Sequence, residues 1–150
     1  MSAASRIVEL LPSWDLTTFE PGTAAAIPGV FGVAPAGANS LYLTSNAGFT
    51  GGFGPRGDNS VKHVVPPSIP NPFGAVTTIA TGLGYPEGLD VFGGDLSIAA
   101  GSGLYTVPTG GGTPTLYAGA PIQYSHGVRA WAGAIHVTDS HGTGEVHKVT

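Results

Sequence analysis

One segment of this chain occurs twice. Residues 85–108 read YPEGLDVFGGDLSIAAGSGLYTVP, and residues 124–150 read YSHGVRAWAGAIHVTDSHGTGEVHKVT, so that Gly88 precedes Gly127 by 39 positions. Self-similarity with a period near 40 residues is the signature of a fold built from copies of one small unit. The repeat therefore constrains the fold strongly and the function only weakly.

Short alternating segments between turn residues predict the type of that unit. Val, Ile, Leu and aromatic residues recur between 25 Gly and 13 Pro, and 41% of the chain is apolar. Alternation of apolar and polar residues with period two indicates β-strands, whereas no segment has helical periodicity. The clearest pairs are Leu41 with Leu43, Leu96 with Ile98, and Ile135 with Val137. We expect an all-β chain.

Each full repeat is predicted to hold four antiparallel strands. In the middle unit these are 88–92, 95–100, 103–108 and 113–118. Four strands in about 40 residues form the blade of a β-propeller. The chain is then one partial propeller domain, residues 1–150, with blade remnants at 6–19, a blade at 30–81, a blade at 88–118 and an incomplete blade at 127–150.

This number of blades does not close a ring, which normally needs four to eight. Two interpretations follow: the chain is a piece of a longer six-bladed propeller, or two copies associate as a homodimer to complete one. A third is a truncated product with no stable fold. We favour the first, because strands of the same type stand at both ends of the chain and two copies would carry strands in excess.

Composition excludes several functions. The net charge is −4 and the five Lys and Arg are scattered, so no basic surface for nucleic acid is expected. The chain has no apolar run of membrane-spanning length and no recognisable signal peptide, so no membrane association is expected. It also lacks cysteine, so disulfides are excluded. The compartment stays unassigned, although the composition slightly favours an exported protein.

The motifs PEGLDVFGGDLSIA and HGVRAWAGAIHVTDSHGTGEVHKV resemble the repeats of the six-bladed propellers grouped around SMP-30/gluconolactonase, NHL repeats and the virginiamycin B lyase-like proteins. The resemblance covers about 65 residues well and implies a propeller fold. The hydrolase branch holds a divalent cation, usually calcium, on the propeller axis through Glu, Asn and Asp side chains. Glu87 and His126 stand at the matching position, directly before Gly88 and Gly127, where the family usually has Asn or Asp.

Four polar side chains are predicted to converge at one mouth of the propeller. Glu87 and His126 precede innermost strands, while Asp139 and His141 follow a second strand, and these loops leave a blade on the same face. We expect His126 and His141 to move protons, since histidine titrates nearest neutral pH. Glu87 and Asp139 are the expected metal ligands. The alternative is that Asp139 stabilises its own turn and His141 is a solvated loop residue.

A second pair of histidines suggests a separate metal site. If the loop SHGT at 140–143 connects two strands, His136 and His147 lie directly opposite each other. Two imidazoles so placed are suited to zinc or copper. A shift of one residue removes this pairing.

The Gly-rich segment GGFGPRGDNS carries no nucleotide site. Its G-x-G-x-x-G spacing contains Pro55, and a strand follows where the dinucleotide fingerprint needs a helix. No other cofactor motif is present. As an insertion between strands, residues 46–59 are expected to lie on the face of the predicted mouth and to cover it.

Two functional hypotheses result. The first is part of a gluconolactonase-like enzyme that acts on an ester or lactone of a small molecule, with a metal at the axial mouth. The alternative is a non-catalytic NHL-like module that binds a protein partner through its loop face. Binding of one divalent ion would favour the enzyme.

Overall fold

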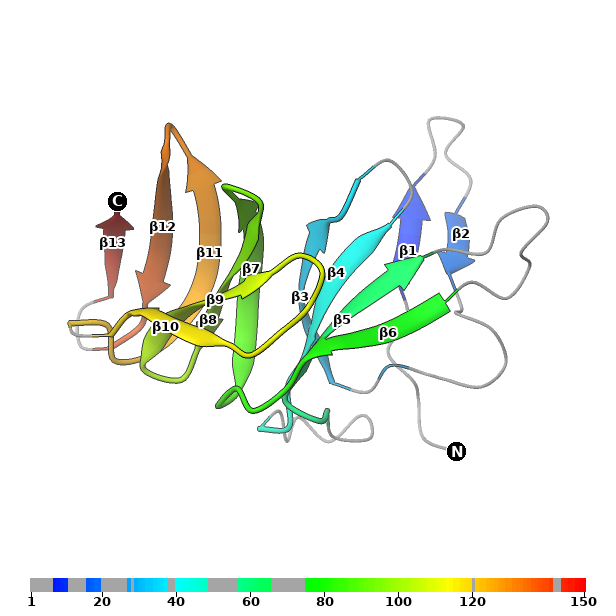
Figure 1. Ribbon diagram of the computed structural model, residues 1–150, viewed down its shortest axis with the longest axis horizontal. Coiled ribbons are helices and arrows are strands. Elements are labelled where there is room, and N and C mark those ends of the chain that lie inside the picture. The colour runs from blue at the N-terminus through cyan, green and yellow to red at the C-terminus, as the bar shows by residue number, and fades with distance from the viewer. Residues whose placement is uncertain are drawn as a thin grey trace.

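The computed structural model describes residues 27, 29–37, 40–48, 57–65, 75–119, 121–141 and 144–150 in full, and the backbone of 7–10 and 16–19. All regular secondary structure in these residues is β-strand (Figure 1). None of them forms a helix of the length and hydropathy that a membrane span requires. The Gly-rich residues 49–56, part of the predicted insertion, lie outside the described residues.

The described strands form four antiparallel sheets, each built from neighbours in sequence. The first full sheet runs β3 (Val30–Pro35), β4 (Leu41–Ser45), β5 (Ser60–Val65), β6 (Ala75–Ala80). The second runs β7 (Pro86–Phe92), β8 (Asp95–Ala100), β9 (Gly103–Pro108), β10 (Thr115–Ala118). The third holds β11 (Ser125–Trp131), β12 (Ala134–Asp139) and β13 (Glu145–Val149). The fourth pairs β1 (Ile7–Leu10) with β2 (Leu16–Phe19).

These sheets are propeller blades arranged in an open arc. The first strands of successive blades contact one another, β3 against β7 and β7 against β11. Figure 1 shows the blades side by side, with β13 at one end and the β1–β2 pair at the other. The predicted all-β fold with four-stranded blades in an incomplete ring is confirmed. Two strands of the middle unit, β8 and β9, have the predicted bounds.

The core lies between the blades. One cluster joins the first and second blades, where Val61 and Tyr42 pack with Leu96 and Ile98. A second joins the second and third blades through Leu104, Ile135 and Val137. Apolar alternation produces this arrangement, because residues two apart on a strand share one face of the sheet.

Two glycines allow the first strands to approach closely. A Cβ added at Gly32 would lie 2.2 Å from the carbonyl oxygen of Glu87, and one at Gly88 would lie 2.3 Å from that of His126. Real Cβ atoms do not approach backbone so closely, so these positions of β3 and β7 require glycine. The residue before each glycine is thereby held against the neighbouring blade.

The predicted pairing of His136 with His147 is wrong. Asp139 pairs with Glu145, so His136 lies opposite Lys148 and His147 lies opposite Val137. The difference is one residue, because Gly144 belongs to the loop: it has a φ of 75°, and its amide donates to the carbonyl of His141 at 3.3 Å. Neighbours on a strand point to opposite faces, so the two imidazoles do not share a metal.

Candidate functional site

In each of the last three blades, the first strand contains a glycine, and the residue directly before that glycine lines one shared pocket. Phe31, Glu87 and His126 hold equivalent places in β3, β7 and β11, and all three line a pocket of about 670 Å³. The other lining residues are Asn46, Gly48, Tyr85, Gly101, Ser102, Gln123, Tyr124 and Ser125. The predicted convergence of Glu87 and His126 is thus present in the structure.

Glu87, His126 and Ser140 form a continuous hydrogen-bonded row. The Glu87 Oε2 contacts His126 Nδ1, and His126 Nε2 lies 2.7 Å from Ser140 Oγ. A carboxylate only accepts, so with Glu87 ionised and the ring neutral the Nδ1–H donates to Glu87 and Nε2 accepts from the Ser140 hydroxyl. The Glu87 side chain is 16% exposed and that of His126 44% exposed, so the imidazole is reachable from solvent while its partner is largely covered.

Backbone contacts fix the members of this row. The Gly127 amide donates to Thr138 Oγ1 at 2.7 Å, which ties the strand that carries His126 to the strand that leads to Ser140. The Thr44 hydroxyl donates to the Glu87 carbonyl, which ties Glu87 to the first blade. Glu87 and His126 therefore project from packed strands, which hold side chains more precisely than loops do.

Asp139 occupies a different environment from the one expected. Its oxygens accept amide hydrogens from Gln123 at 2.7 Å, from Tyr124 at 2.9 Å and from His141 at 2.9 Å. These hydrogen bonds, that of His141 foremost, lower the pKa of Asp139 to about 2 against the opposing effect of burial; the charge of His147 adds to the lowering. The carboxylate fastens the loop before β11 to the end of β12, as the turn-stabilising alternative requires.

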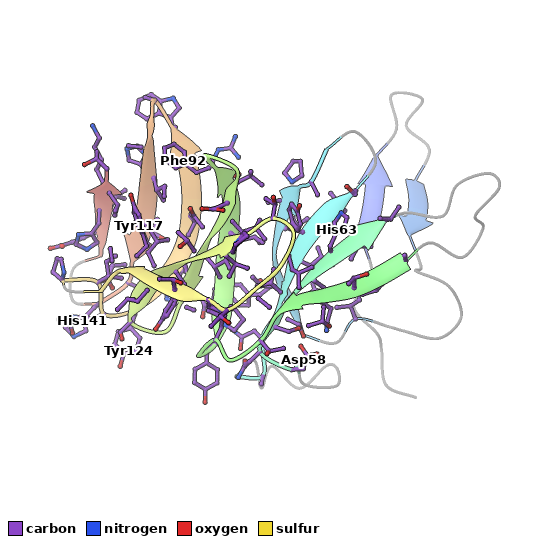
Figure 2. The ribbon with its side chains drawn as sticks, viewed as in Figure 1. Asp58, His63, Phe92, Tyr117, Tyr124 and His141 are labelled. Carbon is purple, nitrogen blue, oxygen red and sulfur yellow. The ribbon has the colours of Figure 1, made fainter. Side chains whose placement is uncertain are left out.

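His141 lies beside the pocket. Its ring stacks on that of Tyr124, with centroids 5.8 Å apart and planes 19° apart, and Figure 2 shows both at the same end of the third blade. Tyr124 lines the pocket, so His141 supports one wall of it. Among the residues that the structure describes, no hydrogen bond joins His141 to Glu87 or His126, and its part in proton transfer stays a prediction.

His147 and His136 belong to other surroundings. His147 Nε2 lies 3.4 Å from Glu145 Oε2 and 3.7 Å from Asp139 Oδ2, on the face it shares with them. His136 packs against Trp131, with ring centroids 5.6 Å apart. Neither reaches the pocket wall described above.

The two predicted metal ligands do not fit calcium as they stand. The Glu87 carboxylate contacts an imidazole, and both oxygens of Asp139 accept amide hydrogens. Calcium takes six to eight oxygen ligands. Within the described part of the chain, no three His, Asp or Glu side chains form a group that could hold a metal ion. Calcium at the mouth stays a prediction.

Ser140 and Asn46 are the residues that sequence reasoning missed. Each directly follows the second strand of its blade, and Gly101 holds that place in the middle blade. Aligning the repeats beyond the strand ends would have revealed this position. Ser125, next to His126, is no part of the row: it is buried, and its hydroxyl lies 3.0 Å from the carbonyl of Gly103.

Comparison with known proteins shows the fold alone. No family model matches the chain, and no curated protein matches it. A solved structure of a luciferin-regenerating enzyme is similar over 98% of this chain, with a TM-score of 0.71 and 15% sequence identity. The chain spans about half of that protein, 52% of its length.

The family expected from the repeat motifs is therefore corrected. The assignment to the SMP-30/gluconolactonase, NHL and virginiamycin B lyase-like group is wrong, since no family model matches and the structural similarity comes with only 15% identity. Similar propellers carry unrelated chemistries. What the structure and the comparison establish together is an all-β, propeller-like fold.

Proposed function

We propose that the chain forms part of a propeller enzyme that hydrolyses an ester or lactone of a small polar molecule in the 670 Å³ pocket. His126 acts as general base and then general acid, and Glu87 orients its ring. The observation that carries the proposal is the Glu87 contact to His126 Nδ1 at the wall of this pocket.

Acyl transfer needs a group that takes a proton from the nucleophile and returns it to the leaving alkoxide. Histidine suits both steps, since its ordinary pKa is nearest neutral. Glu87 holds the proton on Nδ1, so that Nε2 is the free base, and it stabilises the imidazolium that forms.

The pocket suits a small organic molecule. Its volume falls within the usual range for ligand sites, roughly 300–1,000 Å³. Phe31, Tyr85 and Tyr124 supply aromatic surface, and Asn46 and Gln123 supply amides that can orient polar groups. The structural neighbour is named as an enzyme, which supports a catalytic role in a fold of this kind.

The test is hydrolysis of p-nitrophenyl acetate, p-nitrophenyl butyrate and simple γ- and δ-lactones by the 150-residue chain. We expect His126→Gln to reduce turnover by about 10²–10⁴-fold, the usual contribution of a general base. Glu87→Gln should reduce it by a smaller factor. His63→Gln, a histidine on β5 that packs against Tyr42, is the matched control and should match the native chain. Hydrolysis that survives His126→Gln would refute the proposal.

A second candidate is a module that binds a partner through the loop face. It is favoured by the 55% and 60% exposure of Tyr85 and Tyr124 at the rim. Exposed aromatics beside a pocket are typical of binding surfaces. Absence of hydrolysis on every substrate, together with no calcium binding by calorimetry, would favour this candidate over the enzyme.

A further inference from the structure

We propose that Ser140 is the nucleophile of this site and forms an acyl-serine intermediate; this rests on the proposed ester or lactone hydrolysis. The geometry is that of a serine, histidine and carboxylate in one row. Ser140 Oγ lies 2.7 Å from His126 Nε2, while the other ring nitrogen contacts Glu87. A nucleophile and a base within hydrogen-bond distance, with the base oriented by a third group, define this class of catalyst.

The backbone holds Ser140 in position. Its amide donates to the carbonyl of Tyr124 at 3.0 Å, and the next amide, of His141, donates to Asp139 Oδ1 at 2.9 Å. Asp139 also accepts a hydrogen bond from the Tyr124 amide. The same carboxylate therefore holds both Tyr124, whose carbonyl binds the Ser140 amide, and His141, which follows Ser140 in the chain. Because both of its carboxylate oxygens accept backbone amide hydrogens, Asp139 acts on Ser140 as a positioning residue.

The place of Ser140 in the repeat supports a chemical role. The equivalent residue is Asn46 in the first blade and Gly101 in the second, so of these three blades only the third has a hydroxyl group at this position. Asn46 makes the same backbone contact, donating its amide to the carbonyl of Gly29 at 2.8 Å. The turn therefore does not need serine. Ser140 is exposed and stands beside His126, which lines the pocket.

The reaction balances without a cofactor. The Ser140 hydroxyl proton moves to His126 Nε2 while Oγ bonds to the carbonyl carbon. The tetrahedral intermediate collapses, the ester C–O bond breaks, and the proton passes from Nε2 to the leaving alkoxide. Water then attacks the acyl-serine, its proton going to Nε2 and on to Ser140 Oγ, which releases the acid.

The test is labelling of the whole chain with a fluorophosphonate probe, followed by peptide mass spectrometry. We expect phosphonylation of Ser140, lost in Ser140→Ala and reduced by at least tenfold in His126→Gln. Ser40→Ala removes the hydroxyl of a serine directly before β4, whose backbone carbonyl accepts the Ala36 amide; this variant should label as the native chain does. No label on Ser140, or a label on Ser102 instead, would overturn the inference.

Kinetics separates this inference from the proposed function. With p-nitrophenyl acetate we expect a burst of one p-nitrophenol per chain, absent in Ser140→Ala and partly restored in Ser140→Cys. Turnover that depends on His126 but persists in Ser140→Ala would mean that water is the nucleophile, so the inference fails and the function stands. Labelling of Ser140 without hydrolysis of any ester or lactone would support the nucleophile and refute the function.

Discussion

The two junctions that join the last three blades have the same backbone arrangement and different chemistry. At both junctions, a glycine lets the first strand of one blade approach a backbone carbonyl on the first strand of the next. A Cβ added at Gly32 would lie 2.2 Å from the carbonyl oxygen of Glu87, and one added at Gly88 would lie 2.3 Å from that of His126. The first junction places Phe31 beside Glu87, and the second places Glu87 beside His126. Only the second has a base next to an acid. The repeat therefore supplies the geometry, and single residues decide what each junction can do.

Both junctions should depend strongly on their buried leucines. Leu96 belongs to the cluster between the first two blades and Leu104 to the cluster between the last two, and both are fully buried. We expect Leu96→Ala and Leu104→Ala each to lower the free energy of unfolding by about 2–5 kcal/mol, measured in urea. Leu116→Ala, at a 55% exposed leucine, is the control and should change it by less than about 0.5 kcal/mol. A small loss at only one junction would show that the two are packed unequally.

Substitution of Gly32 and Gly88 should affect stability similarly and labelling of Ser140 differently. Gly32→Ala and Gly88→Ala each introduce a methyl group into backbone atoms, so each should cost about 1–3 kcal/mol. Gly88→Ala displaces the strand that carries His126, so it should also impair labelling of Ser140 strongly. Gly32→Ala displaces Glu87, which only orients the His126 ring, so it should impair labelling less. Gly110→Ala faces open space and should leave both properties unchanged. Equal loss of labelling in the two variants would contradict the distinction between the junctions.

Asp139 should make the second junction sensitive to acid. Its pKa falls to about 2, mainly through the His141 amide, from an ordinary value of 3.8. A carboxyl with a lowered pKa stabilises the folded state above its ordinary pKa, and this contribution is lost as the pH falls through the folded value. Stability of the native chain should therefore exceed that of Asp139→Asn at pH 7, with the difference shrinking between about pH 4 and pH 2. The measurement is unfolding of both proteins, monitored by circular dichroism from pH 7 to pH 2. If the difference in their free energies of unfolding stayed constant down to pH 2, the lowered pKa of Asp139 would be disproved.

The smallest effect is expected at the surface of the second junction. Arg129 lies 3.5 Å from Asp90 but is 77% exposed, so Arg129→Ala should change stability by less than about 0.5 kcal/mol. Asp90 also accepts the Ala130 amide at 2.9 Å. Asp90→Ala should therefore cost about 1 kcal/mol by thermal unfolding. A larger loss from Arg129→Ala than from Asp90→Ala would reverse this order.

The sequence determined the strands better than the turns. Alternation and glycine placement located β8 and β9 to the residue, because side-chain period and turn residues are local properties. The register of β12 against β13 was missed by one residue, because it depends on the backbone of Gly144, whose φ of 75° is not encoded in the alternation. One residue of loop length reverses the face of every side chain on a strand.

The site was predictable in its location and only partly in its members. The repeat brings Glu87 and His126 to one pocket, as expected from their equal distance to a glycine. The carboxylate of Asp139 was assigned to a metal, since its amide partners come from a loop whose course only the structure shows. Ser140 escaped notice because its partner lies on another strand, 14 positions away.

Phe31, Glu87 and His126 are each followed by a glycine, and this arrangement affects how such a chain can evolve. Because the close approach of the strands depends on the glycine, the preceding side chain projects into the pocket without being part of the interlocking core. An aromatic ring, a carboxylate and an imidazole all occur at this place in one molecule. A duplicated unit of this kind can thus acquire new reactivity by exchanging one residue per copy while its architecture is inherited intact.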